Sequence, residues 1–245
     1  MAERAALITG GSSGIGLAIA RTLGAEGYGV TISARRPEKL EEAAQELRSA
    51  GLDVLSVAAN VVEEEEIVGL VDAHRERFGR LDVLVNNAGV GIGQPMDGIQ
   101  TKHLDMQLGV NLRSYVIATR EALPLLKQAG GEHGKALVVN TASIAGKSGQ
   151  PWISVYSATK FGVVGFSQAT QKEVGADGIQ VTAFCPGFVD TPMTEWARGE
   201  VEPKDMIRPE DIAEAVRMLL RTSPNCHIPE IVFQRPGEAL GAGVG

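Results

Sequence analysis

The residues of this sequence most suited to chemistry are Tyr156 and Lys160, a phenol and an amine four positions apart. In a helix this spacing places both side chains on one face. A free phenol has a pKa of about 10, and a neighbouring ammonium group favours the ionised form and lowers that value. The pair therefore predicts a tyrosine that acts as a general acid or base near neutral pH.

A hydroxyl group is expected at the same site. Ser143 follows residues 136–140, an apolar run that predicts a buried strand. Active groups of parallel sheets gather at the carboxyl ends of the strands, and a hydroxyl there can donate a hydrogen bond to a carbonyl oxygen that gains negative charge. Either feature alone is weak, because Y-x-x-x-K spacing often arises by chance and a serine after a strand is usually a turn residue.

A glycine-rich turn near the N-terminal end predicts nucleotide binding. Residues 9–16 follow the pattern T-G-x-x-x-G-x-G and join an apolar run, residues 5–8, to a helical pattern over residues 15–27. Glycines allow a tight turn and let a pyrophosphate approach the helix N-terminus closely. Many such turns carry glycine for geometry alone, but the position after the first strand of a βαβ unit favours a nucleotide.

The end of the second predicted strand, residues 29–33, indicates which nucleotide. Arg35 and Arg36 stand where a carboxylate would bind the ribose hydroxyls of NAD. A guanidinium can instead form forked, charge-assisted hydrogen bonds with a 2′-phosphate. The sequence therefore favours NADP(H) over NAD(H), with Arg35 as the stronger candidate; the alternative is an ordinary surface pair before a helix.

The elements that position these residues alternate between strand and helix. This order predicts an α/β fold, a doubly wound parallel sheet of Rossmann type with about seven strands and helices on both faces. We expect a single domain over residues 1–236 and a disordered tail over residues 237–245. The predicted strands are 5–8, 29–33, 52–58, 81–85, 136–140, 179–184 and 228–233, and the predicted helices are 15–27, 37–50, one opening at 63–66, 101–127, 154–175 and 209–221.

Composition excludes several other classes. The net charge of −7 argues against a nucleic-acid surface. No apolar stretch reaches the ~18 residues of a membrane span, and the first residues lack the pattern of a signal peptide, so we expect a cytoplasmic protein without membrane contact. Cys185 and Cys226 lie in apolar surroundings and are expected to be buried thiols. Cys226 and His227 have no further ligands at metal spacing, so no metal site is expected.

The order of features along the chain is more specific than any one of them. Residues from about 5 to 233 resemble the short-chain dehydrogenase/reductase family, in particular its 3-oxoacyl-[acyl-carrier-protein] reductase-like branch. The features that carry the resemblance are the glycine-rich turn, Asn86-Asn87-Ala88-Gly89, Asn111, Ser143, Tyr156 with Lys160, and Pro186-Gly187.

The resemblance implies a role for each matching residue. Tyr156 would be the general acid/base, Ser143 would orient the carbonyl, Lys160 would bind the nicotinamide ribose and lower the pKa of Tyr156, and Asn111 would hold a water behind Lys160. Asn86 is more typical of a sheet-stabilising residue than of a ligand. The residues expected to bind the cofactor are Gly10, Ser12, Ser13, Gly14, Ile15, Gly16, Arg35, Arg36, Asn60, Val61, Asn87, Ala88, Gly89, Tyr156, Lys160, Pro186, Gly187, Val189 and Thr191.

The function expected from these residues is hydride transfer between a nicotinamide and a ketone, an aldehyde or an alcohol. A 3-oxoacyl thioester reductase is an alternative within the family; a non-catalytic NADP-binding redox sensor and a structural partner subunit are alternatives of other classes. Substrate recognition is expected in residues 91–96, 146–153 and 188–207, where Trp152, Met193, Trp196 and Met206 either line an apolar pocket or pack in the core or a subunit contact. The family also implies a homodimer or homotetramer associating through the helices near 102–127 and 154–175.

Overall fold

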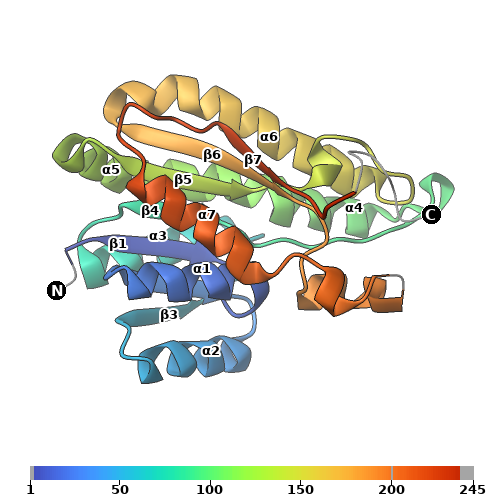
Figure 1. The fold of residues 1–245 in the computed structure, drawn as a ribbon, viewed down its shortest axis with the longest axis horizontal. Coiled ribbons are helices and arrows are strands. Elements are labelled where there is room, and N and C mark those ends of the chain that lie inside the picture. Colours follow the sequence, from blue (N-terminus) through green and yellow to red (C-terminus); the bar gives the residue numbers. More distant parts are fainter. Residues whose placement is uncertain (1–2, 200, 238–245) are drawn as a thin grey trace.

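The computed structural model describes residues 3–199 and 201–237. Its centre is one sheet in which every neighbouring pair of strands is parallel, in the order β3-β2-β1-β4-β5-β6-β7 (Figure 1). The seven strands of the described residues are β1 (Ala5–Thr9), β2 (Gly29–Ala34), β3 (Val54–Ala58), β4 (Val83–Asn86), β5 (Ala136–Thr141), β6 (Ile179–Pro186) and β7 (Glu230–Phe233).

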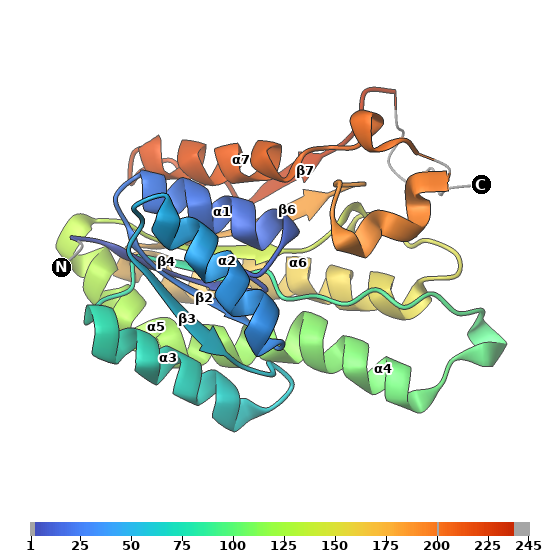
Figure 2. The ribbon, with the colours of Figure 1, turned by 90° about the horizontal axis from the view of Figure 1, so that it is seen from below.

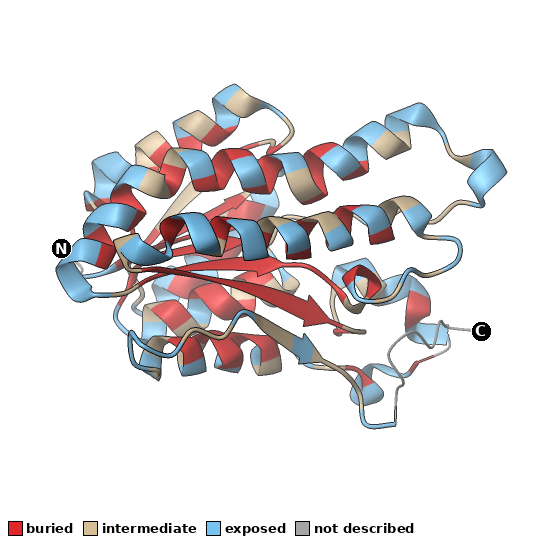
Figure 3. Cartoon of the chain, turned by 90° about the horizontal axis from the view of Figure 1, so that it is seen from above, coloured by how far each residue is buried: buried red, intermediate tan, exposed pale blue. Residues whose placement is uncertain are grey.

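Helices cover both faces of the sheet. One face carries α1 (Gly14–Ala25), α2 (Pro37–Ser49) and α7 (Pro209–Arg221); the other carries α3 (Glu64–Phe78), α4 (Thr101–Leu108), α5 (Ser114–His133) and α6 (Ser154–Val174) (Figure 2). The central strands are buried and the edge strands β3 and β7 are only partly so, while the helices bury one stripe and expose the other (Figure 3). The predicted α/β class, the parallel sheet and the two helical layers are confirmed.

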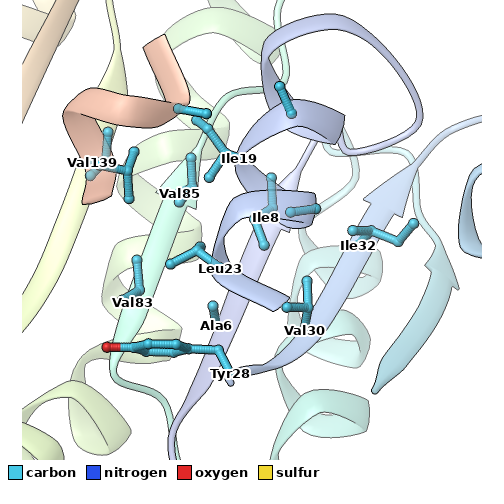
Figure 4. Packing of buried hydrophobic residues seen from close by; sticks show 14 of the residues in the cluster. Ala6, Ile8, Ile19, Leu23, Tyr28, Val30, Ile32, Val83, Val85 and Val139 are labelled. Atoms are coloured by element: carbon cyan, nitrogen blue, oxygen red, sulfur yellow. The ribbon is translucent and has the colours of Figure 1, made fainter. Parts of the chain in front are cut away.

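The core explains why the strands read as continuous apolar runs. Every residue of β1, β4, β5 and β6 is buried, since each strand packs against helices on both faces. On the α1 face, Ile8, Val85 and Val139 of three adjacent strands meet Ile19 and Leu23 of α1 (Figure 4). This packing fixes the position of α1, whose start carries part of the expected site.

The strand order creates the crevice in which ligands of such sheets bind. The chain proceeds outward from β1 to β2 and β3, then returns across β1 to begin β4 on its other side. The loops after β1 and β4 therefore diverge to opposite faces, which opens a space at their carboxyl ends. Thr9, Asn86 and Thr141 end three adjacent strands there.

The segment predicted as one helix over 101–127 differs from the expectation. It consists of α4, a π-helical turn η2 (Gly109–Arg113), and α5, which continues past Pro124 to His133. Gly134 ends α5 in the left-handed conformation that glycine adopts without strain, with φ of 70°. The prediction carried the helix past Pro124 but ended it at Lys127, six residues before its observed end at His133.

Smaller differences concern boundaries and one thiol. β3 and β7 begin two residues later than predicted, at Val54 and Glu230. Cys185 is buried as expected, but the prediction for Cys226 was wrong: this residue is exposed, in the turn before β7. The tail expected to be disordered, residues 237–245, lies outside the described residues apart from Gly237.

Candidate active site

The glycine-rich turn has the close contacts that its sequence predicted. Gly10 and Gly14 have φ of 68° and 53°, a region that other residues rarely adopt. At Gly16 an added Cβ would lie 2.3 Å from the Gly10 carbonyl oxygen, so only glycine fits between the turn and α1. At Gly14 it would lie 2.8 Å from Cγ2 of Thr191. The segment after β6 therefore lies directly over the turn.

The turn is bonded to the end of β4 by Thr9, the first residue of the predicted pattern, to which the sequence analysis gave no role of its own. The Thr9 hydroxyl accepts hydrogen bonds from the backbone N–H groups of Asn87 at 3.0 Å and Ala88 at 3.1 Å. The Asn87 side-chain NH2 in turn donates to the carbonyls of Thr9 at 3.1 Å and Gly10 at 3.2 Å. The Asn87 amide thus holds the turn in shape, whereas sequence analysis expected it to contact the cofactor. The place of Thr9 as the one polar residue at the end of an apolar strand was the signal that could have indicated this role.

A hollow lies between this turn and the ends of β2 and β3. No carboxylate lines it, and Arg35 and Arg36 are exposed at its rim, without an ion pair to any residue of 3–199 or 201–237. Two guanidinium groups beside a glycine-rich helix start suit a phosphate-bearing ligand. The lining residues are Gly10, Ser12, Ala34, Arg35, Arg36, Ala59, Asn60, Val61, Ala88, Gly89, Val90 and Val110.

Tyr156 and Lys160 do share one face of α6. Lys160 is 3% exposed, and its Nζ donates to the Thr141 carbonyl at 2.7 Å and lies 5.5 Å from the centre of the Tyr156 ring. The helix begins at Ser154, so the phenol stands in its first turn and the amine one turn deeper. This places both groups at the carboxyl end of β5.

The pKa values of the pair differ from the simplest expectation. Burial lowers the pKa of Lys160 from 10.5 to about 7. Burial also raises the pKa of Tyr156, and a hydrogen bond with Ser143 opposes part of that rise. The expected lowering of the phenol's pKa by the ammonium group is absent from this structure, because desolvation of the buried phenol dominates.

Ser143 completes the cluster from the end of β5. Its side chain is buried, accepts a hydrogen bond from the Ala145 N–H at 3.1 Å, and lies 3.4 Å from the Pro186 carbonyl, to which it donates. Its hydroxyl also opposes part of the rise in the pKa of the Tyr156 phenol, so the two hydroxyls are neighbours. Ser143, Tyr156 and Lys160 therefore form one connected group.

Asn111 lies inside the π-helical turn. Its Nδ2 donates to the Val90 carbonyl and its Oδ1 accepts from the Val90 N–H, both at 2.8 Å, and Nδ2 also lies 3.2 Å from the Thr159 hydroxyl. These bonds hold the loop after β4 against α6, so its amide is occupied by protein groups. Such turns are frequent at functional sites, but no sequence pattern indicated this one.

Tyr115 is a residue that sequence analysis missed. Its side chain is 1% exposed, and its hydroxyl lies 3.0 Å from the Ala88 carbonyl and 3.2 Å from the Thr141 carbonyl, between the ends of β4 and β5. The Lys160 ammonium lies 5.7 Å from the centre of its ring. Tyr115 shares the Thr141 carbonyl with Lys160, which makes it a candidate positioning residue.

The segment after β6 closes the far side of the turn. Gly187 donates from its N–H to the Phe233 carbonyl at 2.9 Å, and Val189 is buried and pairs with Ile207. Pro186 ends β6 beside Ser143. Val189 and Thr191, the residues expected to fix a nicotinamide, thus lie near the glycine-rich turn.

Two negative findings concern the described residues only. No group of three or more His, Cys, Asp or Glu side chains within residues 3–199 and 201–237 could hold a metal ion. Over the same residues, none of the helices combines the length and apolarity needed to cross a bilayer.

The sheet, its crevice and the polar cluster define a Rossmann-type protein of the dinucleotide-binding class. A family model described as short chain dehydrogenase matches residues 4–201. A Streptomyces coelicolor protein provisionally named a ketoacyl reductase is 44% identical over 196 residues, which span 79% of this chain and 73% of the relative. The chain belongs to the short-chain dehydrogenase family and is an oxidoreductase, as its resemblance predicted.

Solved structures agree with this assignment. A variant of the actinorhodin polyketide ketoreductase, crystallised with NADPH, is 36% identical, has a TM-score of 0.85, and is matched over 95% of this chain and 97% of its own. The 3-ketoacyl-(acyl-carrier-protein) reductase from Brucella melitensis, complexed with NADH, is 30% identical with a TM-score of 0.86, over 94% of this chain and 96% of its own.

Proposed function

We propose that this protein is an NADP(H)-dependent reductase that converts a ketone or aldehyde to an alcohol. The observation that carries the proposal is the connected group of Ser143, Tyr156 and Lys160 at the carboxyl end of β5, beside a hollow rimmed by two exposed arginines. NADPH supplies a hydride when bound. The protein's own side chains would orient the carbonyl group and donate the proton.

The phenol of Tyr156 donates a proton to the carbonyl oxygen of the substrate. Ser143 donates a hydrogen bond to the same oxygen as its negative charge grows, which lowers the energy of the transition state. Lys160, fixed by the Thr141 carbonyl, would hold the nicotinamide ribose next to the phenol, and its protonated form would favour the phenolate once the proton has left. Asn111 keeps the Val90 loop in place beside them.

The hollow suits NADP(H) more than NAD(H). Arg35 and Arg36 are exposed at its rim and no carboxylate lines it, so a 2′-phosphate gains charge-assisted hydrogen bonds that a ribose hydroxyl does not. The NADPH in the actinorhodin ketoreductase supports this choice. We place the phosphates at Gly10, Ser12, Ser13 and Ile15, the adenosine at Arg35, Arg36, Asn60 and Val61, and the nicotinamide near Val189 and Thr191.

A 3-oxoacyl thioester is the second candidate substrate. The Streptomyces relatives named as ketoacyl reductases and the Brucella reductase favour it. A redox sensor would bind NADPH without turnover, so kinetics separate it from both enzymes. We further propose that the chain forms a homodimer or homotetramer through α4–α5 and α6, which a light-scattering mass would test.

The test is the loss of reduced-nicotinamide absorbance with a panel of ketones, aldehydes and acyl thioesters. Tyr156→Phe should fold and bind NADPH normally, yet lose roughly 10²–10⁴-fold in kcat, the usual contribution of positioned proton transfer. Ser154→Ala, an exposed change at the start of the same helix, is the matched control. Near-normal turnover by the phenylalanine variant would refute the proposed role of Tyr156.

A further inference from the structure

Three aromatic side chains from distant segments meet beyond the carboxyl ends of the strands. Trp152 precedes α6, while Phe188 and Trp196 follow β6, the latter in η5 (Pro192–Gly199), at the sheet end where the strand arrows point (Figure 2). The ring centroids of Trp152 and Trp196 are 6.2 Å apart and those of Phe188 and Trp196 are 6.1 Å apart, both edge to face. We call these three residues the aromatic wall.

The wall has a buried support and an exposed surface. Phe188 packs against a small core of Ala197, Val201 and Met206, which anchors η5. Trp152 is 56% exposed and Trp196 60% exposed. Large aromatic groups held together with their faces in solvent are typical of a binding surface.

A short glycine-containing loop connects the wall to the proposed acid. At Gly91 an added Cβ would lie 3.8 Å from the Tyr156 ring, and at Gly93 it would lie 2.4 Å from the Trp152 ring. The Gln94 N–H donates to the Trp152 carbonyl at 2.7 Å. One strip of chain thus contacts both the phenol and the first indole, so a ligand on the wall lies next to Tyr156.

The backbone of Trp152 indicates that its position is functional. Its φ is 67°, the one positive value at a non-glycine residue within 3–199 and 201–237. A bulky residue in this region is strained, and strain of this kind clusters at ligand-binding sites. Glycine would relieve it, yet the chain places its bulkiest side chain there.

The charges around the wall neutralise one another. Arg198 pairs with Asp190 at 3.0 Å and with Glu195 at 3.8 Å, so this guanidinium is already engaged. The Arg235 guanidinium lies 5.6 Å from the centre of the Phe188 ring. An uncharged ligand therefore matches the wall better than one rich in phosphate or carboxylate.

We propose that the enzyme takes neutral ketones whose carbonyl lies in, or is attached to, a ring fused to a planar aromatic ring, which stacks on one of the indoles of Trp152 and Trp196 and contacts the other edge to face. This inference builds on the proposed function, since it names the substrate class of the same site. Stacking fixes the plane of the ring, and with it the direction of the carbonyl oxygen relative to Tyr156 and Ser143.

The composition of the chain offers a direct test, because Trp152 and Trp196 are its only tryptophans. Intrinsic indole fluorescence therefore reports on the wall alone. Titration with 2-tetralone, a ketone fused to an aromatic ring, should quench the emission saturably, whereas cyclohexanone should not. Trp152→Phe and Trp196→Phe each leave one reporter and should weaken the apparent binding constant.

Kinetics give the second readout. Trp152→Ala and Trp196→Ala should each lower kcat/KM for 2-tetralone roughly tenfold, since an aromatic contact and its covered area are lost, and change that for cyclohexanone less than about twofold. Met218→Ala on α7, a similarly exposed apolar residue away from the site, is the control. Thermal melting and NADPH binding confirm that each variant is folded.

The outcomes separate the two proposals. Equal kcat/KM for both ketones, or parallel losses in the alanine variants, overturns the substrate class and leaves the reductase intact. Saturable quenching by 2-tetralone without turnover of any carbonyl supports the aromatic site and refutes the reductase. Absence of saturable quenching in a folded, NADPH-binding protein overturns the inference.

Discussion

Replacing Lys160 by methionine should show by how much the buried amine lowers the free energy of unfolding. Lys160 is 3% exposed, and its only described hydrogen bond goes to the Thr141 carbonyl, which Tyr115 also contacts. Methionine has a similar unbranched length and no charge, so it keeps most of the packing. The substitution abolishes the proposed function, and the informative readout is the free energy of unfolding.

The magnitude follows from the pKa of Lys160, which burial lowers from 10.5 to about 7. At about 1.36 kcal/mol per pKa unit, burying the charged amine costs roughly 5 kcal/mol, of which loss of the hydrogen bond returns about 1 kcal/mol. Below pH 7 the folded and unfolded chains are both protonated and the full cost applies. Between about pH 7 and pH 10.5 the unfolded chain binds the extra proton, so wild-type stability rises with pH relative to the variant.

Urea unfolding at pH 6, 7.5 and 9 measures this difference. The methionine variant should be more stable than the wild type by several kcal/mol at pH 6, and the advantage should shrink steadily toward pH 9. Lys102→Met, at an exposed position in α4, is the control and should show no such trend. A variant that is less stable at pH 6, or an advantage that does not change with pH, would refute the argument that burial of Lys160 is costly.

Three further substitutions test the cofactor hollow, the positioning residue and the turn. Arg35→Asp should weaken NADPH binding and relax or reverse the preference over NADH; an unchanged ratio of the two dissociation constants would remove Arg35 from the argument. Tyr115→Phe should lower the free energy of unfolding by ~1–2 kcal/mol, because two buried carbonyls lose a hydrogen-bond donor. Thermal melting should show this as a midpoint about 2–6 °C lower, and an unchanged midpoint would contradict the role of the hydroxyl. Gly16→Ala should sharply weaken NADPH binding, since its Cβ would lie 2.3 Å from the Gly10 carbonyl oxygen, whereas Gly69→Ala, which meets open space, should not; equal effects would contradict the role of close approach.

The strands and most helices could be predicted from the sequence because their signals are local. Apolar runs such as residues 136–140 have to be buried on both faces, and a helical period marks α1 and α7. The Tyr156 and Lys160 spacing fixed their common helix face for the same reason. These inferences needed only the period of each element, which does not depend on the rest of the fold.

The remaining features depend on contacts between segments far apart in the chain. The π-helical turn at Asn111 is stabilised by bonds to Val90, and Tyr115 reaches one carbonyl in the loop after β4 and one at the end of β5. A local pattern shows neither contact. The direction of the Tyr156 pKa also escaped prediction, because spacing reveals a neighbouring amine but not the desolvation of both groups. The side chains of the site whose partners lie far away in the sequence are thus the ones that could not be predicted.

The carbonyl oxygen of Thr141 is a shared anchor for two helices that approach it from different directions. Tyr115 reaches it from α5 and Lys160 from α6, at 3.2 Å and 2.7 Å. Any shift of α5 that draws the Tyr115 hydroxyl away would leave the amine as the remaining side-chain partner of this carbonyl among the described residues. The alignment of α5 is thus linked to the surroundings of Lys160 through a single backbone oxygen.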